Sequence, residues 1–501
     1  MSVDANNTPP KRQSYSANDI IYDIWTTSLN LPPSALTALE LPGHAVSEPA
    51  IPSSFKIGSL AQASIALSAL AARLVRSTCL NNSSNNAFPL VRVPLQHAII
   101  EYNSNILYTL KRNNTPLPPY TPNPIGGLHR TSDGYVRIHD VFPNHVQGTL
   151  KLLGLSEHAT REDVQNKVRD WKKLDLETEG TEKGNVAIYA LRSYEEWDAL
   201  PQSGATQSSP ISMKQIEGGG LTPRTLPFRR DGGRKCLSGL RVVEFSRVIA
   251  GPVSGRTLAA HGADVLWVTS PDLPALPFLD IDMSRGKRNI QLDIHNSDDK
   301  ARLMELIRTC DVFIQGYRPG SLAAYGLSPI ELVKLNPNIV YANMSAFGPS
   351  GPWSHRRGFD SLVQTCSGIN VSEAEHAGQG EHSRVLPCQA LDHASGYLLA
   401  TGVMAAIYHQ AVQGAAWEVH VSLAGTMKYL RSLGQYTGAT GFEAVACVKA
   451  QDVSSDMTVT TETPYGTLTA IKHSAHIDEC EVGWDCMACP PEHHHAAWLG
   501  S

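Results

Sequence analysis

The sequence is short of the features that mark a nucleic-acid binder, a disulfide-held secreted protein or a membrane protein. Its 501 residues hold 42 Lys and Arg against 47 Asp and Glu, so the net charge is only -5 and no broad basic face is implied. Nine cysteines are too few for a disulfide scaffold of this length. The most apolar stretches, Leu60–Val75 and Tyr397–Tyr408, fall below the roughly 18 to 20 residues of a membrane span. We expect a soluble cytoplasmic protein that contacts neither nucleic acid nor membrane.

Common nucleotide and hydrolase motifs are also missing. The turn at Phe245–Gly255 holds Gly251, Pro252 and Gly255, which allow close approach of the backbone, but it has no G-x-G-x-x-G pattern and no Walker A lysine. Ser254 and Gly255 do not complete a G-x-S-x-G elbow. The sequence therefore gives weak support to a dinucleotide, a nucleoside triphosphate or a serine-hydrolase site.

Two regions rich in Pro, Gly and Ser, 115–127 and 201–233, divide the chain. The division predicts five parts: a polar N-terminal segment at 1–51, a helical half-repeat at 52–127, a small α+β domain plus linker at 128–235, a sheet domain at 236–425 and a C-terminal tail at 426–501. From Leu237 onward, short β-rich runs alternate with helical ones. This alternation predicts an α/β fold with a doubly wound, Rossmann-like parallel sheet, whose ligand binds outside the carboxyl ends of the strands.

An internal repeat is less obvious. The helical run from Gly58 and the strand-like run from Val91 parallel a helical run from Gly396 and a strand-like run from Val419. About ten extra residues in the first copy coincide with its Asn/Ser-rich loop, and loops absorb insertions at little cost. The alternative is that any two Ala-rich helix-and-strand segments look alike.

Several stretches between Leu237 and Gln410 resemble one family. They read LSGLRVVEFSRVIAGPVSGRTLAAHGADVLWV, RGKRNIQLDI, DVFIQGYRPGSLAAYGL, NPNIVYANMSAFGPSGPW, GFDSLVQTCSG and LPCQALDHASGYLLATGVMAAIYHQ. In this order they resemble the family III CoA-transferases, the CaiB/BaiF group that includes formyl-CoA transferase, carnitine CoA-transferase and α-methylacyl-CoA racemase. The block from Gly126 to Pro201 resembles the family's small domain. The resemblance implies an unusual chain order, with helices and small domain first and the sheet domain second.

Asp392, in the setting LDHASG, matches the family's nucleophilic aspartate. A carboxylate just before an apolar helix is an N-cap candidate, where backbone N–H groups and the helix dipole keep it ionised. The resemblance implies transfer of CoA from an acyl-CoA to a carboxylic acid, through a mixed anhydride and an aspartyl-CoA thioester. Coenzyme A thioester is then a substrate, and no permanently bound cofactor, ATP or metal is implied. We expect a homodimer, and the long, loop-rich form suggests a specialised substrate.

The resemblance also implies positions that contact CoA. They are Ile249, Ala250, Leu292, Asp293, Ile294, His295, Gly316, Tyr317 and Arg318. Arg318 is the residue of this set that can pair with a phosphate. Relatives of the formyl type place basic residues where this chain has Ser270 and Ala324.

Two alternatives stay open. The racemase branch moves a proton with a His in a Gly-His-Asp context, and here that context reads Gly358-Phe359-Asp360, so one base is absent. His393 is the nearby substitute in the sequence. The other alternative is a non-catalytic family member. Because the repeat places Ser54 opposite Asp392, and a serine cannot form the aspartyl anhydride, we expect one site per chain.

A group of Cys and His residues lies near the C-terminus. It comprises Cys480, Cys486, Cys489 and His493–His495, with His473 and His476 nearby. A Cys-x-x-Cys followed by His can bind zinc, whereas the resemblance implies a Pro-rich family tail that ends in Trp-Leu. No metal ligand is assigned from the sequence, and the metal content of the purified protein decides between the two interpretations.

Overall fold

The computed structural model describes residues 12–43, 48–79, 89–113, 115–116, 125–224, 234–445 and 448–500. The first eleven residues of the polar opening and the Asn/Ser-rich loop of the half-repeat lie outside this described part.

A seven-stranded sheet organises the molecule. Its strands are β8 (Ile211–Ile216), β9 (Arg241–Phe245), β10 (Asp264–Thr269), β11 (Arg288–Gln291), β12 (Val312–Gln315), β13 (Val340–Ser345) and β14 (Ala416–Ser422). The order is β11-β10-β9-β12-β13-β14-β8, with every pair parallel except β14 and β8. Taken from β9 onward in chain order, the six parallel strands follow the 3-2-1-4-5-6 order of a doubly wound sheet. The predicted parallel sheet is confirmed.

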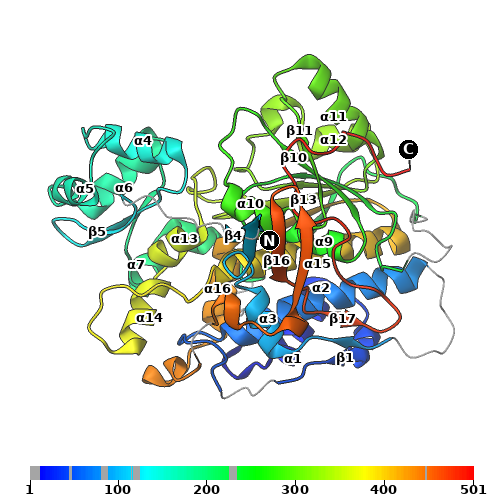
Figure 1. The fold of residues 1–501 in the computed structure, drawn as a ribbon, viewed down its shortest axis with the longest axis horizontal. Coiled ribbons are helices and arrows are strands. Elements are labelled where there is room, and N and C mark those ends of the chain that lie inside the picture. The colour runs from blue at the N-terminus through cyan, green and yellow to red at the C-terminus, as the bar shows by residue number, and fades with distance from the viewer. Residues whose placement is uncertain are drawn as a thin grey trace, which may run out of the picture.

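Helices cover both faces of this sheet (Figure 1). One face carries α11 (Ser297–Thr309) and α12 (Pro329–Leu335), whose Leu303 and Leu332 pack with Val243 and Phe313 in one core cluster. The other face carries α9 (Ala250–Ala260) and α15 (Ala390–Gln413), with α2 (Ile57–Cys79) packed against α15. Side chains alternate between faces along each strand, so both layers are buried at once.

The small domain forms a separate lobe, at the left in Figure 1. Its elements are α4 (Pro143–Leu152), α5 (Arg161–Val168), α6 (Lys173–Thr178) and a three-stranded antiparallel sheet of β5 (Gly127–Arg130), β6 (Tyr135–Ile138) and β7 (Ile188–Ala190). The chain then runs through α7 (Tyr194–Asp198) and α8 (Pro201–Ala205) to β8. Strand β8 lies in the block predicted as small domain plus linker, yet it forms the antiparallel edge of the large sheet.

The half-repeat has the element order of the segment it parallels. Helix α2, strand β2 (Val91–Arg92) and helix α3 (Leu95–Glu101) correspond to α15, β14 and α16 (Leu423–Ser432). Strand β2 belongs to a small sheet with β1 (Leu39–Glu40) and β17 (His476–Ile477), not to the large one. Helix α2 spans 23 residues and is longer than the apolar stretch expected from the sequence, so by length and composition it could cross a membrane. Its apolar window is wholly buried inside the protein, as in a core helix.

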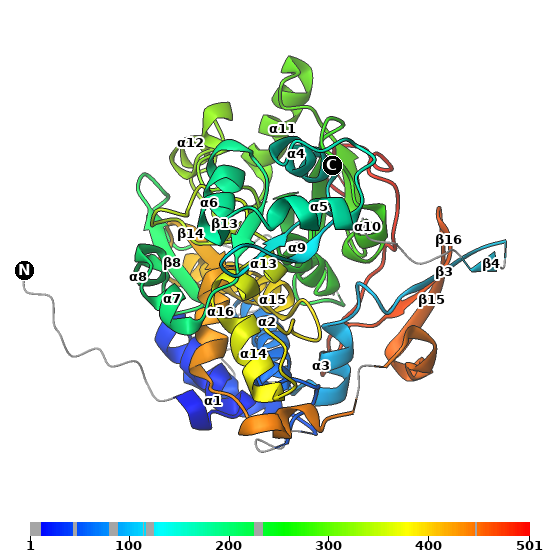
Figure 2. The ribbon, with the colours of Figure 1, turned by 90° about the vertical axis from the view of Figure 1, so that its left-hand side faces the viewer.

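Strands from the predicted half-repeat and the predicted tail form one projecting sheet. Strands β15 (Thr458–Thr463), β16 (Gly466–Ile471), β3 (Thr109–Arg112) and β4 (Thr115–Pro116) form it in that order, and it stands away from the body in Figure 2. The remaining helices are α1 (Ala17–Tyr22), α10 (Pro277–Met283), α13 (Asp360–Cys366) and α14 (Ile369–Ala377). After β17 the tail returns to the start of β11, where Gly286 N–H donates to the carbonyl oxygen of Cys486 over 2.6 Å.

Candidate active site

A cavity of about 570 Å³ opens at the carboxyl ends of the large sheet. Its lining includes Arg247 after β9, Leu273 after β10, Tyr317 after β12 and Ala346 after β13. Gly316 N–H donates to the carbonyl oxygen of Phe245 over 2.7 Å, which joins the ends of β12 and β9. These two strands flank the point where the strand order reverses, the usual ligand position in a doubly wound sheet.

Four helices present their N-terminal ends to this cavity. The lining contains the N-cap Phe142 of α4, the first two residues Ala250 and Gly251 of α9, the third residue Asp392 of α15 and the first residue Leu423 of α16. The first turn of a helix presents backbone N–H groups and the positive end of the helix dipole. The cavity therefore favours an anionic ligand.

Four arginines add positive charge to the same cavity: Arg247, Arg318, Arg356 and Arg357. Arg356 is paired with the carboxylates of Glu177 and Glu182. The other three donate to neutral oxygens: Arg247 to Pro274 O over 3.0 Å, Arg318 to His355 O over 3.4 Å and Arg357 to Asn185 Oδ1 over 2.9 Å. These neutral partners do not cancel their charges, which suit phosphate and carboxylate groups.

Asp392 lies against a second carboxylate. Its backbone N–H donates to Oδ2 of Asp360 over 2.9 Å, so Asp360 at the start of α13 caps the first turn of α15. Burial raises the pKa of Asp360 to about 6, although hydrogen bonds from Asp392 N–H and Gln364 oppose the shift. Burial first, and the charge of Asp360 second, raise the pKa of Asp392 well above its ordinary range. Two buried carboxyl groups so close together resist ionising at the same time.

The local expectation for Asp392 was wrong in two respects. The N-cap of α15 is Gln389, and Asp392 lies inside the first turn. The raised pKa of Asp392 shows that burial and Asp360 outweigh the helix dipole, so in this structure the side chain is held towards its neutral form rather than kept ionised.

Close contact between α15 and α9 fixes where Asp392 lies. Gly396, one turn after Asp392, packs so tightly on α9 that a Cβ at this position would lie 2.5 Å from Val253 Cβ and 2.7 Å from Ala250 O. Val248, just before α9, has a φ of 72°, which is strained for a β-branched residue, and it lines the cavity. Such outliers concentrate at functional sites.

Comparison with known proteins identifies this region. The family model described as CoA-transferase family III matches residues 237–457. This region is similar to CoA-transferase family III, and the match covers less than half of the chain. A protein of Mycobacterium tuberculosis named "probable fatty acyl-CoA transferase" is 33% identical over 202 residues, which are 38% of this chain and 50% of that protein. An acyl-CoA transferase of Gibberella moniliformis is 32% identical over 294 residues, 55% of this chain and 51% of that protein.

A solved structure of the Mycobacterium tuberculosis protein is 31% identical, with a TM-score of 0.36, over 40% of this chain and 57% of that one. The chain thus spans about half the length of the family III relatives that it matches.

The structure brings some of the predicted family III contact residues to the cavity and not others. Asp392, Ala250, Gly316, Tyr317 and Arg318 line it. Ile249 is the buried N-cap of α9, directly before the lining residues. The segment from Leu292 to His295 follows the edge strand β11 and does not line this cavity: Leu292 lies in the core, and His295 contacts the hydroxyl of Tyr325 over 3.2 Å. Its contact with CoA stays a prediction.

His145 is the functional candidate that the sequence analysis missed. It belongs to the first turn of α4 and lines the cavity with Asp392. Its pKa is lowered to about 4 by burial and by the charges of Arg357 and Arg247, so it is neutral at physiological pH. No motif marks it, because nearly 250 residues separate it from Asp392.

The predicted substitute base, His393, lies away from the cavity lining. It is buried in the core, where its Nε2 is 3.2 Å from Asn105 Oδ1 and its ring stacks on Tyr102. Phe359, which replaces the racemase histidine, stacks on His139 with the ring centroids 3.8 Å apart. His139 of the small domain therefore lies beside Phe359, the position where the racemase branch has its histidine base.

Ser54, the counterpart of Asp392 in the half-repeat, has a different setting. It is fully buried, its hydroxyl is bonded to the carboxylate of Glu373, and it receives a hydrogen bond of 2.8 Å from Gln435 Nε2. These contacts tie α14 to the segment before α2. Ser54 does not line the described cavity.

Proposed function

We propose that this protein is an acyl-CoA:carboxylate CoA-transferase with Asp392 as the nucleophile. The observation that carries the proposal is the position of Asp392 in a cavity that combines four helix N-termini with four arginines, at the carboxyl ends of a family III sheet. Both substrates and every leaving group of the reaction are anions, and such a site attracts anions.

The proposed reaction exchanges one thioester for another. A carboxylate oxygen of Asp392 bonds to the thioester carbonyl carbon, the C–S bond breaks, and the electron pair leaves on the CoA thiolate. The thiolate then attacks the aspartyl carbonyl of the mixed anhydride, which expels the donor acid as its carboxylate. The acceptor carboxylate attacks the resulting aspartyl-CoA thioester, forming a second anhydride and freeing the thiolate. The thiolate takes the acyl group of the acceptor, and Asp392 is regenerated.

The residues around Asp392 supply what this chemistry needs. Asp392 attacks as its carboxylate, so the proton that its raised pKa favours leaves to solvent before the bond to the thioester carbonyl forms. We assign stabilisation of the oxyanion at the attacked carbonyl to the backbone N–H groups at the start of α9, because Asp360 already takes the N–H of Asp392 at the start of α15. Arg247, Arg318 and Arg357 are the proposed partners of the acid and phosphate groups.

We retain the predicted CoA contacts at Ile249, Ala250, 292–295 and 316–318 as part of the proposal, together with a homodimer and a specialised carboxylic acid as acceptor. The homologues named as CoA-transferases, one of them a succinate–glutarate enzyme of Agrobacterium fabrum, support transfer between acids in general.

A mass-spectrometric screen tests the proposal. Purified protein is incubated with pairs of a CoA thioester and a free acid, and new thioesters are sought. We expect at least one new thioester with the wild type and none with Asp392→Asn. Asp272→Asn, which removes an exposed carboxylate at the edge of the same cavity, is the matched control and keeps the activity. Equal formation of thioester by Asp392→Asn and wild type contradicts the assignment of the nucleophile.

Proton transfer at the carbon α to the thioester is a second candidate, favoured by one observation. The neutral His145 lines the same cavity as Asp392, so two groups able to move a proton share the site. Exchange of the α-hydrogen of a branched acyl-CoA in deuterated water measures this activity. Loss of exchange in His145→Gln with CoA transfer intact supports the second candidate, and absence of exchange in the wild type excludes it.

A further inference from the structure

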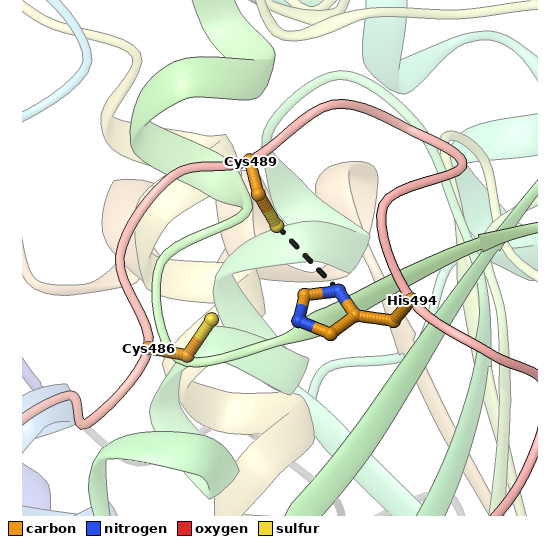
Figure 3. Close-up of side chains that lie close together, drawn as sticks. All are labelled: Cys486, Cys489 and His494. Atoms are coloured by element: carbon orange, nitrogen blue, oxygen red, sulfur yellow. Dashed lines mark hydrogen bonds between the residues drawn. The ribbon is translucent and has the colours of Figure 1, made fainter. Parts of the chain in front are cut away.

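The tail of the chain brings two cysteines and one histidine together far from the cavity. Cys486, Cys489 and His494 converge beside the start of β11, with their side chains directed towards one another (Figure 3). The cavity opens at the carboxyl ends of the strands, whereas β11 begins at Arg288 at the opposite end of the sheet. The cluster is therefore separate from the proposed active site.

The spacing of the ligand atoms fits a tetrahedral zinc ion. Zinc bonds thiolate sulfur at about 2.3 Å and imidazole nitrogen at about 2.0 to 2.1 Å, so two ligands of a tetrahedral ion lie about 3.5 to 3.8 Å apart. Cys489 Sγ is 3.7 Å from His494 Nδ1, and one ligand atom from each of the three residues lies within 4.8 Å of the others. In the structure Nδ1 accepts a hydrogen bond of 3.1 Å from Asn289 N–H, a bond that it exchanges for the ion if Nδ1 is the ligand atom. Shifts of an ångström or less bring all three within bonding distance of a single ion.

The backbone around each ligand is held by the entrance to β11. Asn289, itself buried, accepts a hydrogen bond from His494 N–H over 3.0 Å and donates its Nδ2–H to Cys489 O over 2.6 Å. Gly286 N–H donates to Cys486 O over 2.6 Å. These bonds fix the places of the three residues without using their sulfur atoms. A rigid arrangement of this kind lowers the entropy cost of binding a metal.

Neighbouring Cys and His residues have other partners. Cys480 is hydrogen-bonded to Cys236. His473 Nδ1 lies 3.2 Å from Glu101 Oε2, and His476 Nε2 lies 3.3 Å from Asp478 Oδ1. Of the Cys and His residues grouped in this part of the sequence, Cys486, Cys489 and His494 are the ones that the described structure brings together.

We propose that Cys486, Cys489 and His494 bind one zinc ion, with the fourth coordination position taken by water. Each cysteine loses its thiol proton to solvent when its sulfur bonds to the ion, so two protons are released. Soft thiolates with an imidazole select zinc over magnesium or calcium. The ion fastens the tail to the sheet at the end opposite the cavity.

Metal analysis of the full-length chain tests this proposal. The protein is produced without a histidine tag, passed through metal-free buffer and measured by plasma mass spectrometry. We expect about one zinc per chain in the wild type and a fivefold or greater loss in Cys489→Ser and in His494→Gln, because each removes a ligand. Cys480→Ser and His493→Gln are matched controls from the same segment and keep the full content.

A cobalt titration covers the case in which a variant does not fold. Chelator-treated wild type is titrated with Co²⁺, and thiolate ligation produces an intense charge-transfer absorption band that saturates at one equivalent. Zinc content that stays low after incubation with Zn²⁺, equal zinc in ligand and control variants, or a disulfide between Cys486 and Cys489 in the freshly isolated chain each overturns the proposal. None of these results depends on CoA-transferase activity.

Discussion

Because the carboxyl groups of Asp360 and Asp392 are buried together, we predict that the free energy of unfolding falls as the pH rises through their raised pKa values. The variant Asp360→Asn tests this prediction. The pKa of Asp360 rises from 3.8 to about 6 because the group is buried. A raised pKa contributes stability that is present below pH 3.8 and is lost as the pH rises through 6. The full loss is about 3 kcal/mol, of which about 1.5 kcal/mol falls between pH 5 and pH 8. Asparagine does not titrate, so the variant escapes this loss.

Thermal unfolding followed by tryptophan fluorescence measures the effect at matched ionic strength. Relative to wild type, Asp360→Asn should gain about 3 to 6 °C in melting temperature between pH 5 and pH 8, for a cooperative unit of about 200 residues. The difference from wild type also includes the relief of Asp392, whose pKa Asp360 raises, and this change has the same sign; titrating groups that do not contact Asp360 cancel. Asp272→Asn removes an exposed carboxylate and should stay within about 1 °C of wild type at both pH values. A difference that is constant or falls with pH refutes the reasoning.

Two further substitutions test the packing behind the site. In urea denaturation, Gly396→Ala should lower the free energy of unfolding by about 1 to 3 kcal/mol, because the new Cβ forces α15 away from α9. It should also reduce CoA transfer. Gly204→Ala is the control, because its Cβ meets nothing within 4 Å. Asp282→Asn should cost about 3 to 5 kcal/mol in the same assay, since it leaves the buried Arg256 and Arg285 without their carboxylate. A cost below 1 kcal/mol for either Gly396→Ala or Asp282→Asn contradicts the packing described.

Local sequence patterns were sufficient to predict most strands and helices of the sheet domain. The β-rich runs from Arg241 onward became strands β9 to β13, and the helix at 297–309 has Asn296 as its N-cap with Asp298 and Asp299 in the first turn. Alternation of hydrophobicity and capping residues are short-range signals, so one segment carries all the information needed. The antiparallel strand β8 was missed because it lies in a Pro/Gly/Ser-rich stretch, and its pairing with β14 is a long-range event.

The site was only partly predictable for the same reason. Asp392 and the turns at Ala250 and Gly316 follow from the family resemblance, and the structure brings all three to one cavity. Arg356, Arg357 and His145 carry no motif: the two arginines lie in the loop between β13 and α13, and His145 reaches the cavity through packing of the small domain on the sheet domain. The pKa of Asp392 depends on Asp360, 32 residues away.

Trapping of the acyl-enzyme tests the central claim most directly. The protein is incubated with an acyl-CoA that it accepts, quenched with hydroxylamine, digested and mapped by mass spectrometry. The account predicts a hydroxamate at Asp392 in the wild type, and none in Asp392→Asn, whose folding is checked by its melting temperature. A hydroxamate on another carboxylate, or full acyl exchange with Asp392 unmodified, would contradict it.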